Sequence, residues 1–138
     1  MKKYLLYLIY VLDHKWLVFR ECVELGIFWR GVTHDFSKFS RAEFKAYANH
    51  FYGVKTRETD LAFGRAWEHH KGHNAHHWQY HVKNGSVQEM RTADVLEMIA
   101  DWRAMAKRSG GSPRDYYDAN KAKIILAPMS RYLLESVI

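Results

Sequence analysis

The 138 residues include 21 lysines and arginines against 15 aspartates and glutamates, which gives the chain a net charge of +6. Hydrophobic residues make up 48% of the sequence and only two residues are proline, a composition that excludes a disordered or collagen-like chain. Because Cys22 is the only cysteine, an internal disulfide and a cysteine-based zinc site are excluded, and we expect a reducing, cytoplasmic setting. The length predicts one domain over residues 1–138.

The surplus of positive charge indicates an anionic partner, for which phosphorylated small molecules and nucleic acids both qualify. The basic residues are scattered and form no arginine-rich arm, so a dedicated nucleic-acid surface is not indicated. The apolar run over residues 4–12 follows two lysines, as in a signal peptide, but it is only nine residues long and no small-residue cleavage site follows it. We therefore expect a buried first helix and no membrane segment.

Apolar residues recur along the chain with the period of a helix and without the alternation of a strand. The sequence therefore predicts an all-α protein, a single-domain bundle of about six helices. The first helix is expected to end near Gly26. Its buried face is expected to be one apolar stripe, formed by Leu5, Leu8, Ile9, Leu12, Trp16, Phe19, Val23 and Ile27.

Capping residues, glycines and prolines predict where the other helices begin and end. Thr33 can cap a helical turn that begins at His34, and Ser40 and Glu43 have the spacing of a capping box. Gly72 and Asn74 are expected to interrupt a helix. The predicted segments are a helix over 40–52, a loop over 54–60, and helices from 61, from Ser86 or Thr92 to 107, from 113 to 126 and from 128 onward.

Histidines are concentrated in one part of the chain: of nine in total, six fall within residues 69–81. Neutral imidazole is the commonest ligand of transition metals and carboxylates favour harder ions, so a mixed set indicates a divalent catalytic metal. His34 and Asp35 are adjacent at the start of a predicted helical turn, where both side chains can reach one ion. One carboxylate oxygen of Asp35 can also bridge to a second ion.

Three carboxylates, those of Asp94, Glu97 and Asp101, are spaced by three and four residues, which places them on one side of a helix. Unpaired carboxylates beside apolar residues are costly to bury, so we expect a metal or a cationic partner at Asp101. A solvated helix face is expected at Asp94.

In chain order the candidates are His14, His34-Asp35, His69 or His70, His76 or His77, and Asp101. This order resembles that of the HD superfamily of metal-dependent phosphohydrolases. The stretch from His34 to Lys38 is similar to the His-Asp-x-x-Lys segment of the HD-GYP cyclic dinucleotide phosphodiesterases, although no Gly-Tyr-Pro follows the histidine pair and their specificity is not implied. The segments 34–40, 66–70, 74–78 and 97–102 also resemble a small family of uncharacterised phage and bacterial proteins, and this similarity extends over most of the chain.

The resemblance implies an HD-like bundle around one or two ions of manganese, iron, nickel, cobalt or zinc. The ligands that it implies are His14, His34, Asp35, His70, His77 and Asp101. A break at Gly72 and Asn74 leaves His69 and His76 open as alternatives to His70 and His77. The implied catalytic residues are Asp35 and Lys38, and the candidates for substrate binding are Lys38, His69, His73 and Glu97.

The implied reaction is hydrolysis of a phosphoester in a nucleotide or cyclic nucleotide by metal-activated water. Lys38 would then neutralise charge on the transferring phosphoryl group. Two alternatives stay open: a di-iron oxygenase of the HD type and a non-enzymatic protein that sequesters a nucleotide. A homo-oligomer is also open, because Tyr116, Tyr117 and Tyr132 can serve an interface.

Overall fold

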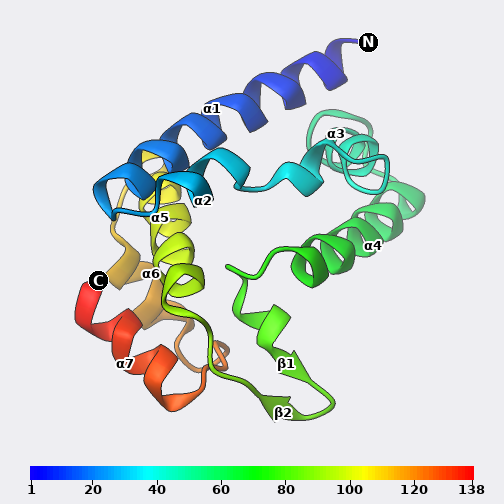
Figure 1. Cartoon of the computed structure of the whole chain (residues 1–138). Coiled ribbons are helices and arrows are strands. Elements are labelled where there is room, and N and C mark those ends of the chain that lie inside the picture. Colours follow the sequence, from blue (N-terminus) through cyan, green and yellow to red (C-terminus); the bar gives the residue numbers. More distant parts are fainter.

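The computed structural model describes residues 1–138 and consists of helices with one short hairpin (Figure 1). The α-helices are α1 (Lys2–Glu24), α2 (Phe28–Thr33), α3 (Phe44–Tyr52), α4 (Arg57–His73), α5 (Thr92–Ser109), α6 (Pro113–Asn120) and α7 (Pro128–Val137). The shorter elements are the 3-10 helices η1 (Phe36–Phe39) and η2 (Trp78–His81) and the strands β1 (Val82–Lys83) and β2 (Ser86–Val87). The predicted all-α class is confirmed. None of the helices combines the length and apolarity that crossing a membrane requires.

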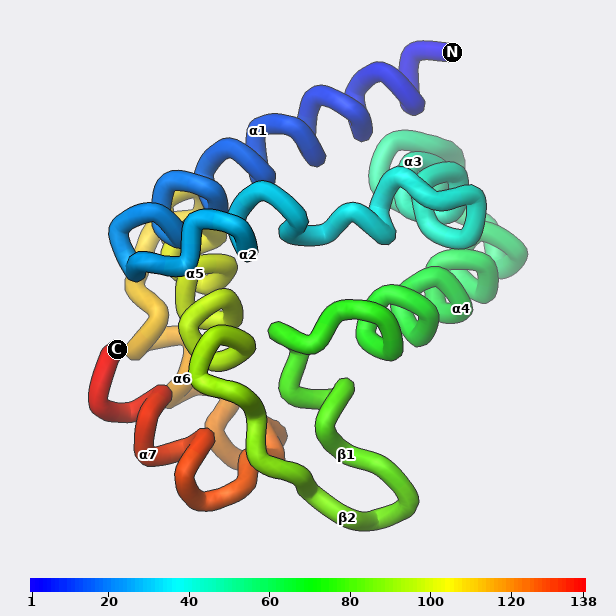
Figure 2. The backbone as a smooth tube through the Cα atoms, viewed as in Figure 1, coloured from blue at the N-terminus to red at the C-terminus, as the bar shows by residue number.

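Helix α1 runs along one side of the molecule and contacts α2, α3 and α5 (Figure 1). Helix α4 packs against α3, whereas α6 and α7 pack against α5. In the tube view, α4 and α5 flank the central region beneath α1, and the chain between them descends into the hairpin (Figure 2). Residues from α1, α4 and α5 can therefore meet at the centre of the fold.

The apolar core is divided into clusters, and polar residues lie between them. One cluster joins α5, α6 and α7 around Ile99, and another joins α1, α3 and α4 around Tyr47. A third cluster joins α1 to α5. His14 lies on α1 between Val11 of the second cluster and Val18 of the third, and it is as buried as they are. Burial of a polar imidazole requires polar partners, so its position marks a polar centre inside the fold.

The prediction of a single buried stripe on α1 is wrong. Leu5, Ile9, Leu12 and Trp16 are between 52% and 59% exposed. The side of α1 that faces the core instead carries Tyr7, Val11, His14, Val18 and Cys22. Helix α1 is apolar on two faces, and periodicity alone does not show which of two apolar faces the rest of the chain covers.

Several predicted boundaries are confirmed, including the helix end at Gly53 and the helix start at Pro113. The predicted loop over 54–60 is shorter, because a capping box between Thr56 and Thr59 starts α4 at Arg57. The unexpected hairpin turns at Asn84 and Gly85, whose φ angles of 50° and 75° suit a two-residue turn. Helix α2 was also unexpected, and it ends just before His34.

Gly31 is the point at which α2 approaches α1. A Cβ at this position would lie 2.9 Å from the Cβ of Cys22 and 2.9 Å from the Cα of Phe19. Gly31→Ala is therefore expected to push α2 outward and to lower the free energy of unfolding by about 1–3 kcal/mol, measured by thermal or denaturant unfolding. Gly64→Ala is the matched control, because a Cβ there meets nothing within 4 Å. Equal loss of stability in both variants would contradict close packing of α2 on α1.

Candidate metal centre

Asp35 stands at the centre of the site, in the connection between α2 and η1. The predicted helical turn starting at His34 is wrong, because α2 ends at Thr33 and Asp35 adopts a left-handed conformation with φ 55°. Aspartate tolerates this conformation better than most residues. The ammonium of Lys15 donates hydrogen bonds to the backbone carbonyls of Val32 and His34 and so holds this connection against α1. The buried carboxylate of Asp35 is thereby held at the centre of the fold.

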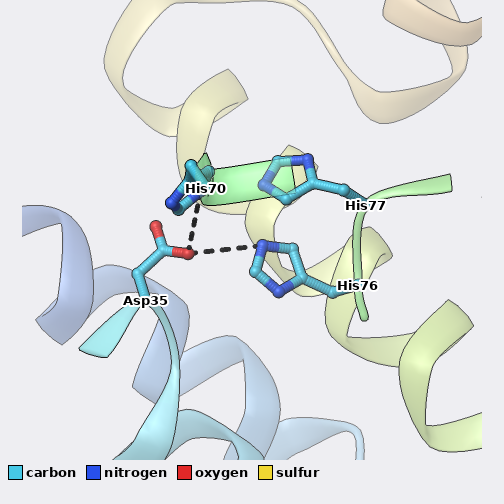
Figure 3. Close-up of side chains that lie close together, drawn as sticks. All are labelled: Asp35, His70, His76 and His77. Carbon is cyan, nitrogen blue, oxygen red and sulfur yellow. Dashed lines mark ion pairs between the residues drawn. The ribbon is translucent and has the colours of Figure 1, made fainter. Parts of the chain in front are cut away.

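The two carboxylate oxygens of Asp35 face different groups of side chains. Oδ1 lies 3.3 Å from Nε2 of His70 and 3.4 Å from Nε2 of His76, and Figure 3 shows both imidazoles directed at this oxygen. Oδ2 lies 3.3 Å from Nε2 of His34 and 3.8 Å from Nε2 of His14. Asp35 is therefore placed between two sets of histidines.

Asp101 on α5 and His77 complete these two sets. Oδ1 of Asp101 lies 3.2 Å from Nε2 of His14. The ligand atoms of His14, His34 and Asp101 all lie within 4.8 Å of one another, and so do those of Asp35, His70, His76 and His77. In Figure 3 the ring of His77 lies beside those of His70 and His76. Each set could hold a metal ion, and Asp35 contacts both.

The Nδ1 atoms of three of these histidines face buried carboxylates. Nδ1 of His34 lies 2.9 Å from Oε1 of Glu97, and Nδ1 of His76 lies 3.2 Å from the same oxygen. Nδ1 of His70 lies 2.9 Å from Oε2 of Glu43. A histidine that donates its Nδ1 proton to a carboxylate leaves Nε2 as the lone-pair donor, which is the usual arrangement around a metal ion. The two glutamates therefore fix both the tautomer and the orientation of the three rings.

Several buried polar atoms at the centre have no hydrogen-bond partner. They are Nδ1 and Nε2 of His14, Nε2 of His34, Oδ1 of Asp35, Nε2 of His76 and Nε2 of His77. An unsatisfied buried polar atom costs about 1–3 kcal/mol, so such a concentration needs a compensating ligand. A divalent cation accepts lone pairs from imidazole and carboxylate together, and the donor set therefore fits one.

The electrostatics of the centre keep three of the candidate ligands, Asp35, Asp101 and His77, in the protonation states that a metal requires. Burial alone would raise the pKa of Asp35, but the positive charges of His34 and Lys38 outweigh it and hold that pKa well below its usual range. The pKa of Asp101 is lowered against burial by His14. Burial, together with the charges of neighbouring imidazoles, lowers the pKa of His77 well below its usual value. At neutral pH both aspartates are ionised and His77 is neutral, as metal ligands must be.

A cavity of about 650 Å³ opens onto the cluster. Its inner end is lined by Asp35, Lys38 and His76, and its outer end by aromatic side chains that include Trp102 and Tyr116. The volume lies within the range of about 300–1,000 Å³ that is common for small-molecule sites. The centre is therefore accessible to a ligand from one side.

The structure brings all six of the predicted metal ligands together, and it adds His76, which the sequence left open as an alternative. It does not bring His69 or His73 to the cavity. His69 lies on the outer side of α4, where its Nδ1 contacts Glu43, and Nδ1 of His73 donates to the carbonyl of His69. The carboxylate of Glu97 is turned toward the imidazoles rather than into the cavity.

Sequence reasoning missed three supporting residues. The spacing of Glu43 from Ser40 predicts a capping box, but the fully buried carboxylate of Glu43 contacts His69 and His70 and makes no cap hydrogen bond. Asp94 is fully buried rather than solvated, and it pairs with Arg30 at 2.5 Å. Arg30 also reaches Oε2 of Glu97 at 3.2 Å and so holds that carboxylate in place. No local pattern marks these pairs, which join residues between 26 and 67 positions apart.

The fold and this cluster define an all-helical protein with a buried centre of histidines and carboxylates that could hold metal ions. The chain belongs to a family of unknown function, DUF5662, whose family model matches residues 3–138. No curated protein matches the chain, and no solved structure matches it either.

His34 makes metal binding depend on pH. Burial opposes its protonation, but the charge of Asp35 and the close contacts of the imidazole with the carboxylates of Asp35 and Glu97 raise the pKa of His34 to about 9. At neutral pH a metal ion must displace this proton, so we expect binding to release a proton and the affinity to rise with pH until about pH 9. Calorimetric titration in buffers of different ionisation enthalpy measures the release, with His50→Gln as a control outside the cluster. An affinity that does not change between about pH 6 and pH 8 would contradict the predicted proton competition.

Proposed function

We propose that the protein is a metal-dependent phosphohydrolase of the HD type, which acts on a nucleotide or a cyclic nucleotide. The proposed cofactor is one or two ions of manganese, iron, nickel, cobalt or zinc. The observation that carries the proposal is the position of Asp35, whose two oxygens face two separate sets of histidines. A carboxylate shared in this way suits a site that holds two ions a few ångströms apart, as in many enzymes that cleave phosphoesters.

The residues around the centre would perform distinct tasks. Bound divalent ions would polarise a phosphoryl oxygen and lower the pKa of a water molecule. Lys38 lines the cavity beside the centre, and its Nζ lies 2.6 Å from Oδ2 of Asp35. Burial would lower the pKa of Lys38, but the charges of Asp35 and Asp101 raise it, so the ammonium stays charged. A fixed cation at this position can stabilise negative charge that develops on a phosphoryl group.

The outer part of the cavity supports a substrate with an aromatic group. Trp102 and Tyr116 line it, with ring centroids 4.8 Å apart. The cavity is also lined by Trp78 and by Trp67, whose ring lies beside that of His70. Aromatic side chains stack on any of the nucleobases, and each stacked pair contributes about 1–3 kcal/mol to binding. The cavity has the volume for one small ligand and not for a folded polymer. A mononucleotide or a small cyclic nucleotide therefore fits both ends of the cavity.

The proposal is tested by a hydrolysis screen of the full chain loaded in turn with each of the five metals. The substrates are nucleoside monophosphates and cyclic nucleotides, and the products are followed by phosphate release and chromatography. We expect at least one compound to be hydrolysed, with activity lost in a chelator and restored by metal. If metal binds but no phosphoester is cleaved, the hydrolase proposal fails. Consumption of oxygen by an iron-loaded sample in the same screen would favour the oxygenase alternative instead.

A variant of Lys38 tests separately whether its ammonium stabilises negative charge on the phosphoryl group. Lys38→Met keeps the length of the side chain and removes its charge, and we expect kcat to fall by about 10²–10³ with the metal content retained. The control is Lys123→Met, which removes an exposed lysine that does not line the cavity. Unchanged kcat in Lys38→Met would show that this ammonium does not act on the phosphoryl group.

A further inference from the structure

Helix α1 carries a second apolar face that the rest of the chain leaves uncovered. The exposed face, called the α1 face below, consists of Leu5, Ile9, Leu12, Trp16, Phe19 and Val23. All but Phe19, which is partly buried, have exposed fractions between 48% and 59%. The opposite face of the helix packs into the core and carries His14 toward the metal centre. Soluble monomers rarely leave a continuous apolar stripe of this length in water.

The spacing within the α1 face is that of a helix–helix seam. The six residues follow one another at intervals of four, three, four, three and four, which is the a/d pattern of a coiled coil over more than two heptads. Such a seam is narrow, and each of its side chains fits between residues of a facing helix. The pattern therefore points to a partner that presents a helix of the same kind.

The α1 face continues onto α2 through a chain of aromatic contacts. Ring centroids lie 5.8 Å apart for Trp16 and Phe19, 5.3 Å for Phe19 and Phe28, and 5.1 Å for Phe28 and Trp29. Trp29 is 74% exposed. With areas of about 150–250 Å² for each aromatic side chain, the exposed parts of this surface amount to roughly 700 Å². A standard protein interface buries about 600–1,000 Å² on each partner, so the surface is large enough for one.

We propose that the α1 face and the neighbouring aromatic residues of α2 form the interface of a two-fold symmetric dimer with a second copy of this chain. The intervals of the seam are the same in both chain directions, so two copies related by a two-fold axis place apolar side chains against each other along the whole helix. The exposed charged residues that flank the seam carry both signs: Lys2 and Arg20 are positive, and Asp13 and Glu24 are negative. A lipid surface would instead favour a border of lysines and arginines. The dimer forms on the side of α1 opposite to His14, independently of the metal centre.

The test is the molar mass of the full chain in solution, measured by analytical ultracentrifugation at micromolar concentrations. We expect the wild type to have twice the 16.4 kDa mass of one chain. Leu12→Glu and Trp16→Glu are each expected to weaken the dimer by at least about 100-fold, because each places a charge in the seam. The matched control is Tyr132→Glu on α7, where the side chain is 69% exposed and lies outside the α1 face. Circular dichroism checks that each variant keeps its helices.

A milder variant keeps the proposal testable if a glutamate disturbs the fold. In Leu12→Cys the new thiol should react slowly with a maleimide when the protein is concentrated and quickly when it is diluted, since the native Cys22 is fully buried. A wild type that stays at 16.4 kDa would overturn the proposal. The proposal would also be overturned if the Leu12→Glu and Trp16→Glu variants formed a dimer as stable as the dimer of the Tyr132→Glu control.

Discussion

Asp35→Asn is expected to abolish metal binding and hydrolysis together, with a fall in kcat/KM of at least about 10³-fold. The amide is the same size as the carboxylate, but it has no charge and only one oxygen, so it cannot serve both sets of histidines. Metal binding is measured by calorimetric titration, and hydrolysis by the assay that the screen identifies. Retention of wild-type affinity in Asp35→Asn would show that this carboxylate does not organise the centre.

The control for this variant is Asp118→Asn, which makes the same chemical change at an exposed position on α6. In the metal-free protein, Asp35→Asn also leaves the charged Lys38 without its buried partner, and loss of one partner of a buried pair costs about 3–5 kcal/mol. Thermal unfolding with and without metal therefore accompanies the titration. Metal is expected to stabilise the wild type and not the variant.

Glu97→Gln is expected to weaken metal binding by about 10–100-fold without removing a ligand. Hydrogen bonds from His34 and His76 lower the pKa of Glu97 to about 2 against its burial, so the wild-type side chain is ionised and accepts from both rings. The glutamine amide has one accepting oxygen and also turns a donor toward the Nδ1 atoms or toward Arg30. Competition with a fluorescent chelator measures the affinity.

Glu68→Gln is the matched control for Glu97→Gln, because the side chain of Glu68 is 73% exposed and pairs only with Lys71. Unchanged affinity in Glu97→Gln, or an equal fall in both variants, would contradict the orienting role of Glu97. A smaller loss is expected in Arg30→Met, since Arg30 acts on the histidines only by holding Glu97.

The fold class and most helix ends could be predicted because they depend on local signals. Glycines, prolines and capping residues act within one turn, so the helix end at Gly53 and the helix start at Pro113 follow from the sequence. The turn at Asn84 and Gly85 also carries a local signal, the Asn-Gly pair, but strands of two residues are too short to show alternation.

The buried face of α1 could not be predicted, because the choice between two apolar faces is made by α2, α3 and α5 and not by α1 itself. For the same reason, the residues that support the metal centre could not be predicted from local sequence patterns. Histidines and aspartates indicate a metal by residue type, and the resemblance to the HD superfamily implied the six candidate ligands that the structure brings together. The supporting residues depend on distant partners, and the spacing of Glu43 from Ser40 fits a capping box that the structure does not form.

Whether His76 or His77 reaches Asp35 depends on how helix α4 ends. Because α4 stops at His73, the segment that follows can turn back, and both His76 and His77 come to lie beside His70. Sequence alone showed that a break was expected at Gly72 and Asn74. It did not show the direction in which the chain leaves the helix, and that direction decides which imidazole reaches Asp35.

The most direct test of the metal centre is an anomalous difference map from crystals of the wild-type protein grown with Mn²⁺ or Zn²⁺. We predict one or two peaks within about 2.0–2.3 Å of a carboxylate oxygen of Asp35, with Nε2 of His70 and His76 around one position and Nε2 of His34 around the other. Peaks confined to the protein surface, with Asp35 and its histidines bound only to one another and to water, would contradict the account.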